Sequence, residues 1–252
     1  MDATSWILLA VVSHPWITVF CEKQNETTIS IDEADLFEGD MLDFVPAFIA
    51  DSFDPSHSAV RNRRRLWPGA VVPVQFHSSF SNRDLNAIVR VMLEFHKKSC
   101  VRFVYKGRSS QNWVHIFPGT GCYAHVGRIG GRQLLSLHRY GCFIKGIIGH
   151  ELLHALGVVH EQSRPDRDQF VTIRLENVRP GRESNFLRYS TQLIDNLNIP
   201  YDYRSVMHYG ARDFSKNGQP TIVPKQSGVT IGQRSGLSAK DWQRINKLYC
   251  QR

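Results

Sequence analysis

Cysteine is scarce in this chain of 252 residues, and extended hydrophobic runs are almost absent. Only residues 5–20 are apolar and nearly uncharged, and His14-Pro15 interrupts them. A membrane-spanning helix needs about 20 apolar residues, so this stretch is too short, and no later stretch qualifies. There is also no internal repeat and no low-complexity block, which excludes a repeat architecture. A hydrophobic content of 42% is still enough for one sizeable globular domain with a flanking segment and no stable membrane association.

The apolar stretch predicts a secretory signal peptide over residues 1–21, and therefore a secreted, extracellular protein. Val19-Phe20-Cys21 supplies the cleavage site, although Asp2 replaces the usual basic start. Removal of this segment discards Cys21, which turns an odd count of five cysteines into four. An exported chain is expected to pair them as disulfides and not to keep them as buried thiols. Sequence alone does not choose among the three possible pairings of Cys100, Cys122, Cys142 and Cys250.

A histidine motif, H-E-L-L-H-A-L-G-V-V-H, carries the chemistry. His150 and His154 are four residues apart, so on a helix both imidazoles reach one metal ion. Glu151 stands where a carboxylate takes a proton from metal-bound water. Gly157 is suited to end the helix, because glycine accepts the left-handed conformation, and the chain then returns His160 as a third ligand. Three neutral imidazoles leave one zinc position open for water, as in catalytic sites.

Two other interpretations compete with catalysis by zinc. The H-E-x-x-H part alone occurs by chance on amphipathic helices, but the glycine and the third histidine sharpen the metal interpretation. A non-catalytic binding protein on a protease scaffold would usually have lost Glu151 or a histidine, and none is missing. Three histidines also bind copper or cobalt, so the metal is a separate question.

Further along, the sequence S-V-M-H-Y places Met207 in a segment like the methionine turn that lies beneath the metal in metzincins. His160 is followed at once by E-Q-S-R-P-D-R-D. Together these sequences resemble the astacin family of zinc endopeptidases, in the metzincin group. The resemblance covers about Leu36 to Cys250, without a departure at any position expected to do chemistry.

The resemblance implies further roles. Tyr209 would ligate zinc in the resting enzyme and then swing away to stabilise the transition state. Glu161 would be linked through water to the new N-terminus after activation. Arg234 would favour acidic residues just after the scissile bond, with a plain surface arginine as the equal alternative. The resemblance also implies the disulfides Cys100–Cys250 and Cys122–Cys142.

Charge divides the chain. Residues 1–61 carry 11 acidic and 2 basic side chains, whereas residues 62–252 carry 12 acidic and 29 basic ones. Because the basic residues are dispersed, we expect no nucleic-acid binding. A basic domain that first holds its own acidic pro-segment and later favours acidic substrates fits better. We therefore expect a pro-segment over 22–61 and a catalytic domain over 62–252.

Within the pro-segment, F-E-G-D resembles the astacin latency motif, in which Asp40 would bind zinc in place of catalytic water. Gly39 would let the backbone approach the metal. The basic run that follows predicts activation by a trypsin-like or furin-like protease near Arg61–Asn62, within a window of about 57–65. Asn25 lies in a sequon and is a candidate glycosylation site.

The predicted fold class is α+β in two lobes. Strands are expected at 71–76, 101–105 and 113–117, in a twisted mixed sheet of the N-terminal lobe. Helices are expected after the capping box at Ser81, at 143–156 around the zinc motif, and from Ser238 to about Tyr249. The C-terminal lobe should be irregular, with the Met-turn and the last helix. We expect a monomer. Because the chain ends two residues after Cys250, we also expect no accessory domain. The predicted function is hydrolysis of internal peptide bonds by a zymogen-derived zinc enzyme.

Overall fold

The computed structural model describes residues 36–42 and 63–251. The predicted signal peptide, the Asn25 sequon and the cleavage point near Arg61–Asn62 lie outside the described residues and stay predictions. None of the helices in the described ranges is long and apolar enough to cross a membrane.

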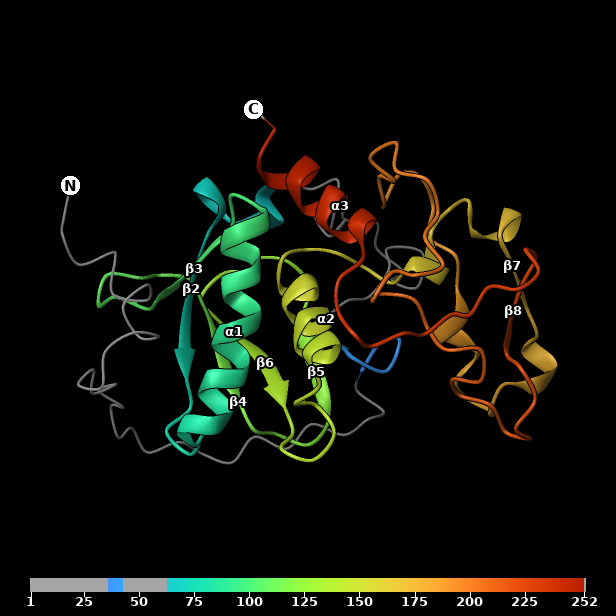
Figure 1. Cartoon of the computed structure of the whole chain (residues 1–252), viewed down its shortest axis with the longest axis horizontal. Helices are drawn as coiled ribbons and strands as arrows, with labels where there is room; N and C mark the ends of the chain where they lie inside the picture. The colour runs from blue at the N-terminus through green and yellow to red at the C-terminus, as the bar shows by residue number, and fades with distance from the viewer. Residues whose placement is uncertain (1–35, 43–62, 252) are drawn as a thin grey trace.

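A six-stranded mixed sheet forms the N-terminal lobe (Figure 1), with the strand order β1-β5-β6-β4-β2-β3. β5 and β6 pair antiparallel, and the other neighbours pair parallel. The predicted strands at 71–76, 101–105 and 113–117 are confirmed within one residue, whereas β1, β5 and β6 were not predicted. The strands are β1 (Met41–Leu42), β2 (Val71–Phe76), β3 (Arg102–Tyr105), β4 (Trp113–Phe117), β5 (Cys122–His125) and β6 (Arg132–Leu137).

Helices α1 (Asn82–Lys98) and α2 (Lys145–Ala155) lie next to each other against this sheet (Figure 1). α1 begins at a capping box, in which the Ser81 hydroxyl accepts from the Asp84 amide. Its apolar side packs into the main core, where the rings of Phe95 and Phe103 meet edge to face at 5.4 Å. α2 is buried along almost its whole length, so it is fixed on all sides.

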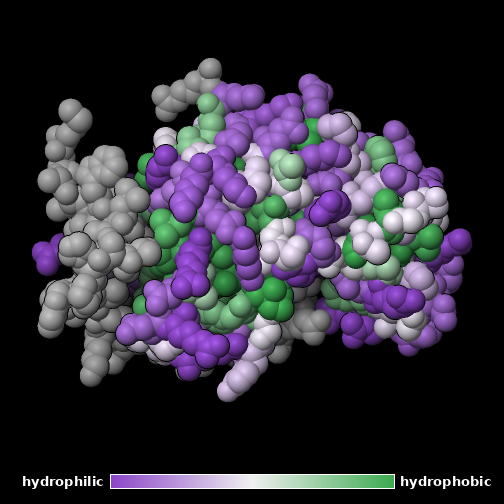
Figure 2. Space-filling model, viewed as in Figure 1, coloured by the Kyte–Doolittle hydropathy of each residue, from purple (hydrophilic) through white to green (hydrophobic). Residues whose placement is uncertain are grey.

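The C-terminal lobe is irregular, as predicted. It consists of short 3₁₀ turns and loops around a two-stranded antiparallel sheet of β7 (Val171–Ile173) and β8 (Ile222–Pro224). The final helix α3 (Ala239–Tyr249) returns to the N-terminal lobe, where Trp242 packs on Phe95 at 4.9 Å. On the face in Figure 2, hydrophilic residues cover much of the surface and hydrophobic residues form patches between them.

Two disulfides join distant parts of the chain. Cys100 pairs with Cys250 across 150 residues, and Cys122 pairs with Cys142. The pairing implied by the family resemblance is therefore confirmed. The first bond ties the end of α3 to the segment after α1. The two-lobed α+β architecture is likewise confirmed.

Candidate metal centre

α2 delivers the first two histidines of the motif. His150 and His154 are both buried on this helix, and their rings meet edge to face at 4.6 Å. The helix ends where predicted, because Gly157 adopts a φ of +91° and its amide donates to the His154 carbonyl at 2.7 Å. The reversed chain then brings the His160 ring to 4.8 Å from that of His154.

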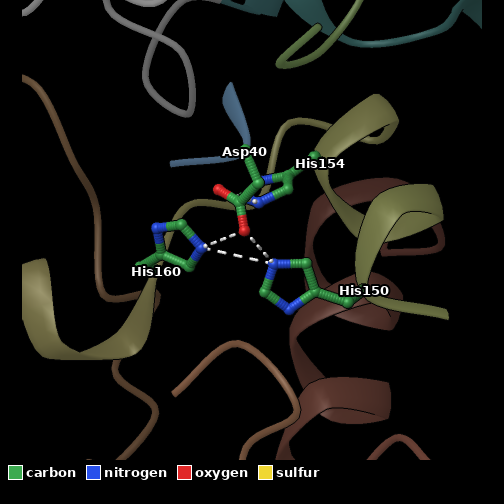
Figure 3. A group of neighbouring side chains, drawn as sticks. All are labelled: Asp40, His150, His154 and His160. Carbon is green, nitrogen blue, oxygen red and sulfur yellow. Dashed lines mark hydrogen bonds and ion pairs between the residues drawn. The ribbon is translucent and has the colours of Figure 1, made fainter. Parts of the chain in front are cut away.

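Asp40 of the predicted pro-segment meets the three histidines (Figure 3). One ligand atom from each of the four residues lies within 4.8 Å of the others. Oδ2 of Asp40 is 3.0 Å from Nε2 of His150 and 3.2 Å from Nε2 of His160. Oδ1 is 3.5 Å from Nε2 of His154. Figure 3 shows this carboxylate pointing between the rings.

The outer nitrogen of each ring has its own partner. Nδ1 of His150 lies 2.9 Å from the Val206 carbonyl, and Nδ1 of His154 lies 2.8 Å from the Val158 carbonyl. A carbonyl only accepts, so each Nδ1 carries the proton and each Nε2 turns its lone pair inward. These two lone pairs, together with Nε2 of His160 and the Asp40 carboxylate, form a set of donor atoms that a cation at their centre would satisfy.

Two atoms at this centre support the same conclusion. Oδ1 of Asp40 and Nε2 of His154 are buried and have no hydrogen-bond partner in the described structure. Buried polar atoms are seldom left unpaired, and coordination to a metal would satisfy both. Three imidazoles and one carboxylate form a donor set that zinc accepts in tetrahedral geometry. The residues therefore fit the predicted zinc ion.

Burial and the nearby carboxylates shift the pKa values of the histidines in opposite directions. Burial lowers the pKa of His150 to about 3. Burial acts the same way on His160, but the charges of Asp40 and Glu38 outweigh it and raise the pKa of His160 to about 9. Burial opposes ionisation of Asp40, yet the His160 and His154 rings hold its pKa well below the usual range. The site therefore favours an anionic carboxylate facing positive charge.

Glu151, the predicted general base, is buried beside these ligands on α2. Burial first, and then the negative charge of Asp40, hold the pKa of Glu151 well above its usual range. The guanidinium of Arg234 acts in the opposite direction. A carboxyl with a raised pKa binds a proton more readily than an ordinary glutamate does, which suits a group that takes up a proton during the reaction.

A tight turn brings Asp40 to the site. Gly39 has a φ of +78°, which favours glycine, and a Cβ there would lie 2.7 Å from the Phe214 ring. The close approach is therefore to Phe214. After the turn, β1 pairs in parallel with β5, and the Ala124 amide donates to the Asp40 carbonyl at 2.9 Å. The sheet edge thus fixes the backbone that carries the carboxylate.

The segment around Met207 contacts α2 through the His150 ring. Met207 is fully buried, and the preceding carbonyl of Val206 is the acceptor for His150. Asp241 of α3 accepts from the Ser205 hydroxyl at 2.6 Å and from the Val206 amide at 2.9 Å. Asp241 was not identified from the sequence, where its visible signal was only its capping box with Ser238.

Tyr209 lies next to the metal ligands in the described arrangement. Its ring is 4.8 Å from that of His160, and its hydroxyl donates to the main-chain carbonyl of Glu38. Burial first, then the charges of Glu38 and Asp40, hold the pKa of this phenol well above its usual range. The hydroxyl is therefore protonated and held by the Glu38 carbonyl, in the predicted pro-segment.

Glu161 is buried between two arginines. Its Oε2 accepts from Arg244 at 2.6 Å, and its Oε1 accepts from Arg164 at 3.0 Å and from the Asp202 amide at 2.8 Å. Burial opposes ionisation, but Arg244 and then Arg164 lower the pKa of Glu161. A small cavity beside it is lined by His160, Asn196 and both arginines, among others.

Arg234 lies beside the Met-turn and is partly exposed. Its Nη1 donates to the His208 carbonyl at 2.9 Å. Its own carbonyl accepts from the Gly146 amide at 3.0 Å, and a Cβ at Gly146 would lie 2.0 Å from that oxygen. The loop therefore packs directly on the first turn of α2, with the guanidinium close enough to influence Glu151.

Known proteins resemble the chain over this region. The model of the astacin peptidase family matches residues 59–250. Zinc metalloproteinase nas-15 of Caenorhabditis elegans is 44% identical over 226 residues, which cover 85% of this chain and 39% of that protein. Zinc metalloproteinase nas-13 of the same nematode is 44% identical over 224 residues, or 84% of this chain and 50% of that protein. The chain thus spans half the length of these relatives or less.

A solved structure gives the same result. High choriolytic enzyme 1, a hatching enzyme zinc-protease from the medaka fish Oryzias latipes, superposes with a TM-score of 0.69 at 42% identity. The superposition covers 74% of this chain and 94% of that one. Myroilysin, at 20% identity and a TM-score of 0.52, shares the fold alone.

Proposed function

Because the chain belongs to the astacin family, we propose that it is a secreted zinc endopeptidase that is made as a latent zymogen. The predicted family, its zinc cofactor and its peptidase class agree with the matches above. The proposal of latency depends on one observation. Asp40 precedes His150 by 110 residues, yet its carboxylate lies 3.0 Å from the His150 ring. This is the place where the zinc position open to water is expected.

The proposed chemistry is hydrolysis of an internal peptide bond. When bound, zinc would lower the pKa of its water to about 7 and would polarise the scissile carbonyl. Glu151 takes the water proton on its carboxylate and later delivers it to the leaving amine. Tyr209, once its hydroxyl leaves the Glu38 carbonyl, donates to the oxygen on which negative charge develops. As a resting-state zinc ligand, Tyr209 remains a prediction from the family resemblance.

We propose that protein substrates bind as extended peptides along the edge of the sheet. β1 of the pro-segment occupies this edge by pairing with β5. When the pro-segment leaves, the main-chain groups of β5 are free to pair with an incoming chain, as in other cases of strand addition. The position of Arg234 near Glu151 supports a preference for acidic residues next to the scissile bond.

Activation requires cleavage after the pro-segment, which we assign to a trypsin-like or furin-like protease. The basic run ends in a short 3₁₀ turn (Arg63–Arg65), which the structure describes as largely exposed. The new N-terminus would carry a positive charge toward Glu161. The cavity beside Glu161 supports this route, because it leaves room for water between the two charges. Secretion, the domain boundaries and the monomeric state are parts of the same proposal.

The decisive experiment compares wild type with Glu151→Gln after activation with trypsin. Wild type should digest casein or gelatin and stop when a chelator is added. Glu151→Gln should keep one zinc per chain and lose nearly all activity, because the amide does not accept the water proton. A zinc-loaded Glu151→Gln enzyme with full activity would remove Glu151 from the mechanism. A wild-type chain that binds zinc but cleaves nothing would favour the non-catalytic binding protein.

A further inference from the structure

Glu38, two residues before Asp40, is a buried acidic side chain that the proposed mechanism does not use. It is 1% exposed, although it belongs to a segment that leaves on activation. Its backbone adopts a φ of +50°, in the left-handed region that residues other than glycine rarely occupy. A glutamate in this conformation and away from water requires compensating contacts.

The Glu38 carboxylate has three partners in the catalytic domain. Oε2 lies 2.5 Å from Nδ1 of His160. Oε1 accepts from the hydroxyls of Ser163 and Tyr189, each at 2.7 Å. The Glu38 carbonyl accepts from the hydroxyl of Tyr209. One residue of the pro-segment is therefore held by side chains that surround a single predicted zinc ligand.

We propose that Glu38 is a second latency residue, which locks His160 in its metal-binding tautomer while the pro-segment is in place. An ionised carboxylate only accepts hydrogen bonds, so Nδ1 of His160 carries the proton. The lone pair then lies on Nε2, which is 3.2 Å from Asp40. Asp40 occupies the open position, and Glu38 orients the third histidine from outside. This inference rests on the proposed function, because it assumes a zinc-bound latent form.

The other two histidines have a different kind of outer partner. His150 and His154 bond to the carbonyls of Val206 and Val158, which remain after cleavage. Of these three rings, His160 is the one whose outer partner leaves with the pro-segment. Activation therefore removes one zinc ligand and the support of another in the same event, and it also releases the Tyr209 hydroxyl for catalysis.

The test measures the zinc affinity of the intact zymogen by competition with a chromogenic chelator. Glu38→Met keeps the side-chain length but removes both acceptors, so zinc binding should weaken roughly 10- to 100-fold, as when other outer partners are removed. Glu38→Gln keeps an amide oxygen that can accept from His160, and its affinity should lie between the two. Cleavage removes residue 38 from every variant, so the mature enzymes are identical and provide the control.

Weaker zinc binding by both zymogens, with equal mature enzymes, supports the inference. A Glu38→Met zymogen that binds zinc as tightly as wild type overturns it. If Glu38→Met does not fold, wild-type affinity in Glu38→Gln overturns it instead. Asp40→Ala, assayed in parallel for proteolysis before cleavage, tests the proposed latency separately. If the Asp40→Ala zymogen is inactive, the proposed latency is contradicted. The zinc affinities of the Glu38 variants still decide the role of Glu38 at His160.

Discussion

Asp241, in the first turn of α3, connects the last helix to the candidate metal centre through the Met-turn. Its carboxylate accepts from the Ser205 hydroxyl, the Val206 amide and the Ser238 amide, at 2.6, 2.9 and 2.9 Å. The carbonyl of Val206 in turn accepts from Nδ1 of His150 at 2.9 Å. One buried carboxylate thus caps a helix and fixes the acceptor that orients a predicted zinc ligand.

We expect Asp241→Ala to lower the free energy of unfolding by about 3 kcal/mol, because two buried donors and one partly buried donor lose an acceptor at roughly 1 kcal/mol each. Asp84→Ala is the matched control. Asp84 forms the same capping box with Ser81 on α1, is partly exposed, and pairs at the surface with Arg139 at 3.8 Å. Its loss should cost about 1 kcal/mol, as for other helix caps.

Urea unfolding of the two mature variants measures the difference, and chelator competition measures zinc affinity. Zinc affinity should fall in Asp241→Ala, because the Val206 carbonyl loses its fixed position, and should stay at the wild-type value in Asp84→Ala. Equal unfolding costs, or unchanged zinc affinity in both variants, would refute a link between α3 and the metal centre.

Three further outcomes are expected. Asp40→Ala should give a zymogen that digests casein before cleavage, measured on chain that mass spectrometry shows to be intact; a silent zymogen would contradict the switch. His115 lies in the middle of β4, and burial lowers its pKa to about 3, so the unfolded chain takes up this proton first between about pH 6.5 and 3. Acidification through that window therefore destabilises the fold, and His115→Phe should flatten the pH dependence of the unfolding free energy there, which an unchanged slope would disprove. Arg234→Ala should weaken any preference for acidic residues next to the scissile bond in a peptide library, and an unchanged preference would remove its role.

Local patterns in the sequence predicted α2, which carries two of the ligands, and the starts of α1 and α3. The spacing of the histidines, the glycine after α2 and the capping boxes of α1 and α3 are all short-range signals. β6 was missed because R-Q-L-L-S-L has no β-branched or aromatic residue, and β1 and β5 are too short to show an alternation. These strands depend on pairing with distant neighbours.

The surroundings of the ligands were less accessible to sequence reasoning. The acceptors for His150 and His154 are main-chain carbonyls, which any residue supplies. Glu38 gains its partners from three residues in two segments that are more than 100 residues away, at sequence separations of 122, 125 and 151. Its position beside the latency aspartate was visible, but its burial was not.

Anomalous diffraction at the zinc edge, from crystals of the intact zymogen, tests the central claim most directly. We predict one zinc ion about 2.0–2.2 Å from Nε2 of His150, His154 and His160 and from a carboxylate oxygen of Asp40. A zinc ion that lacks the Asp40 ligand, or that binds away from these three imidazoles, would contradict this prediction.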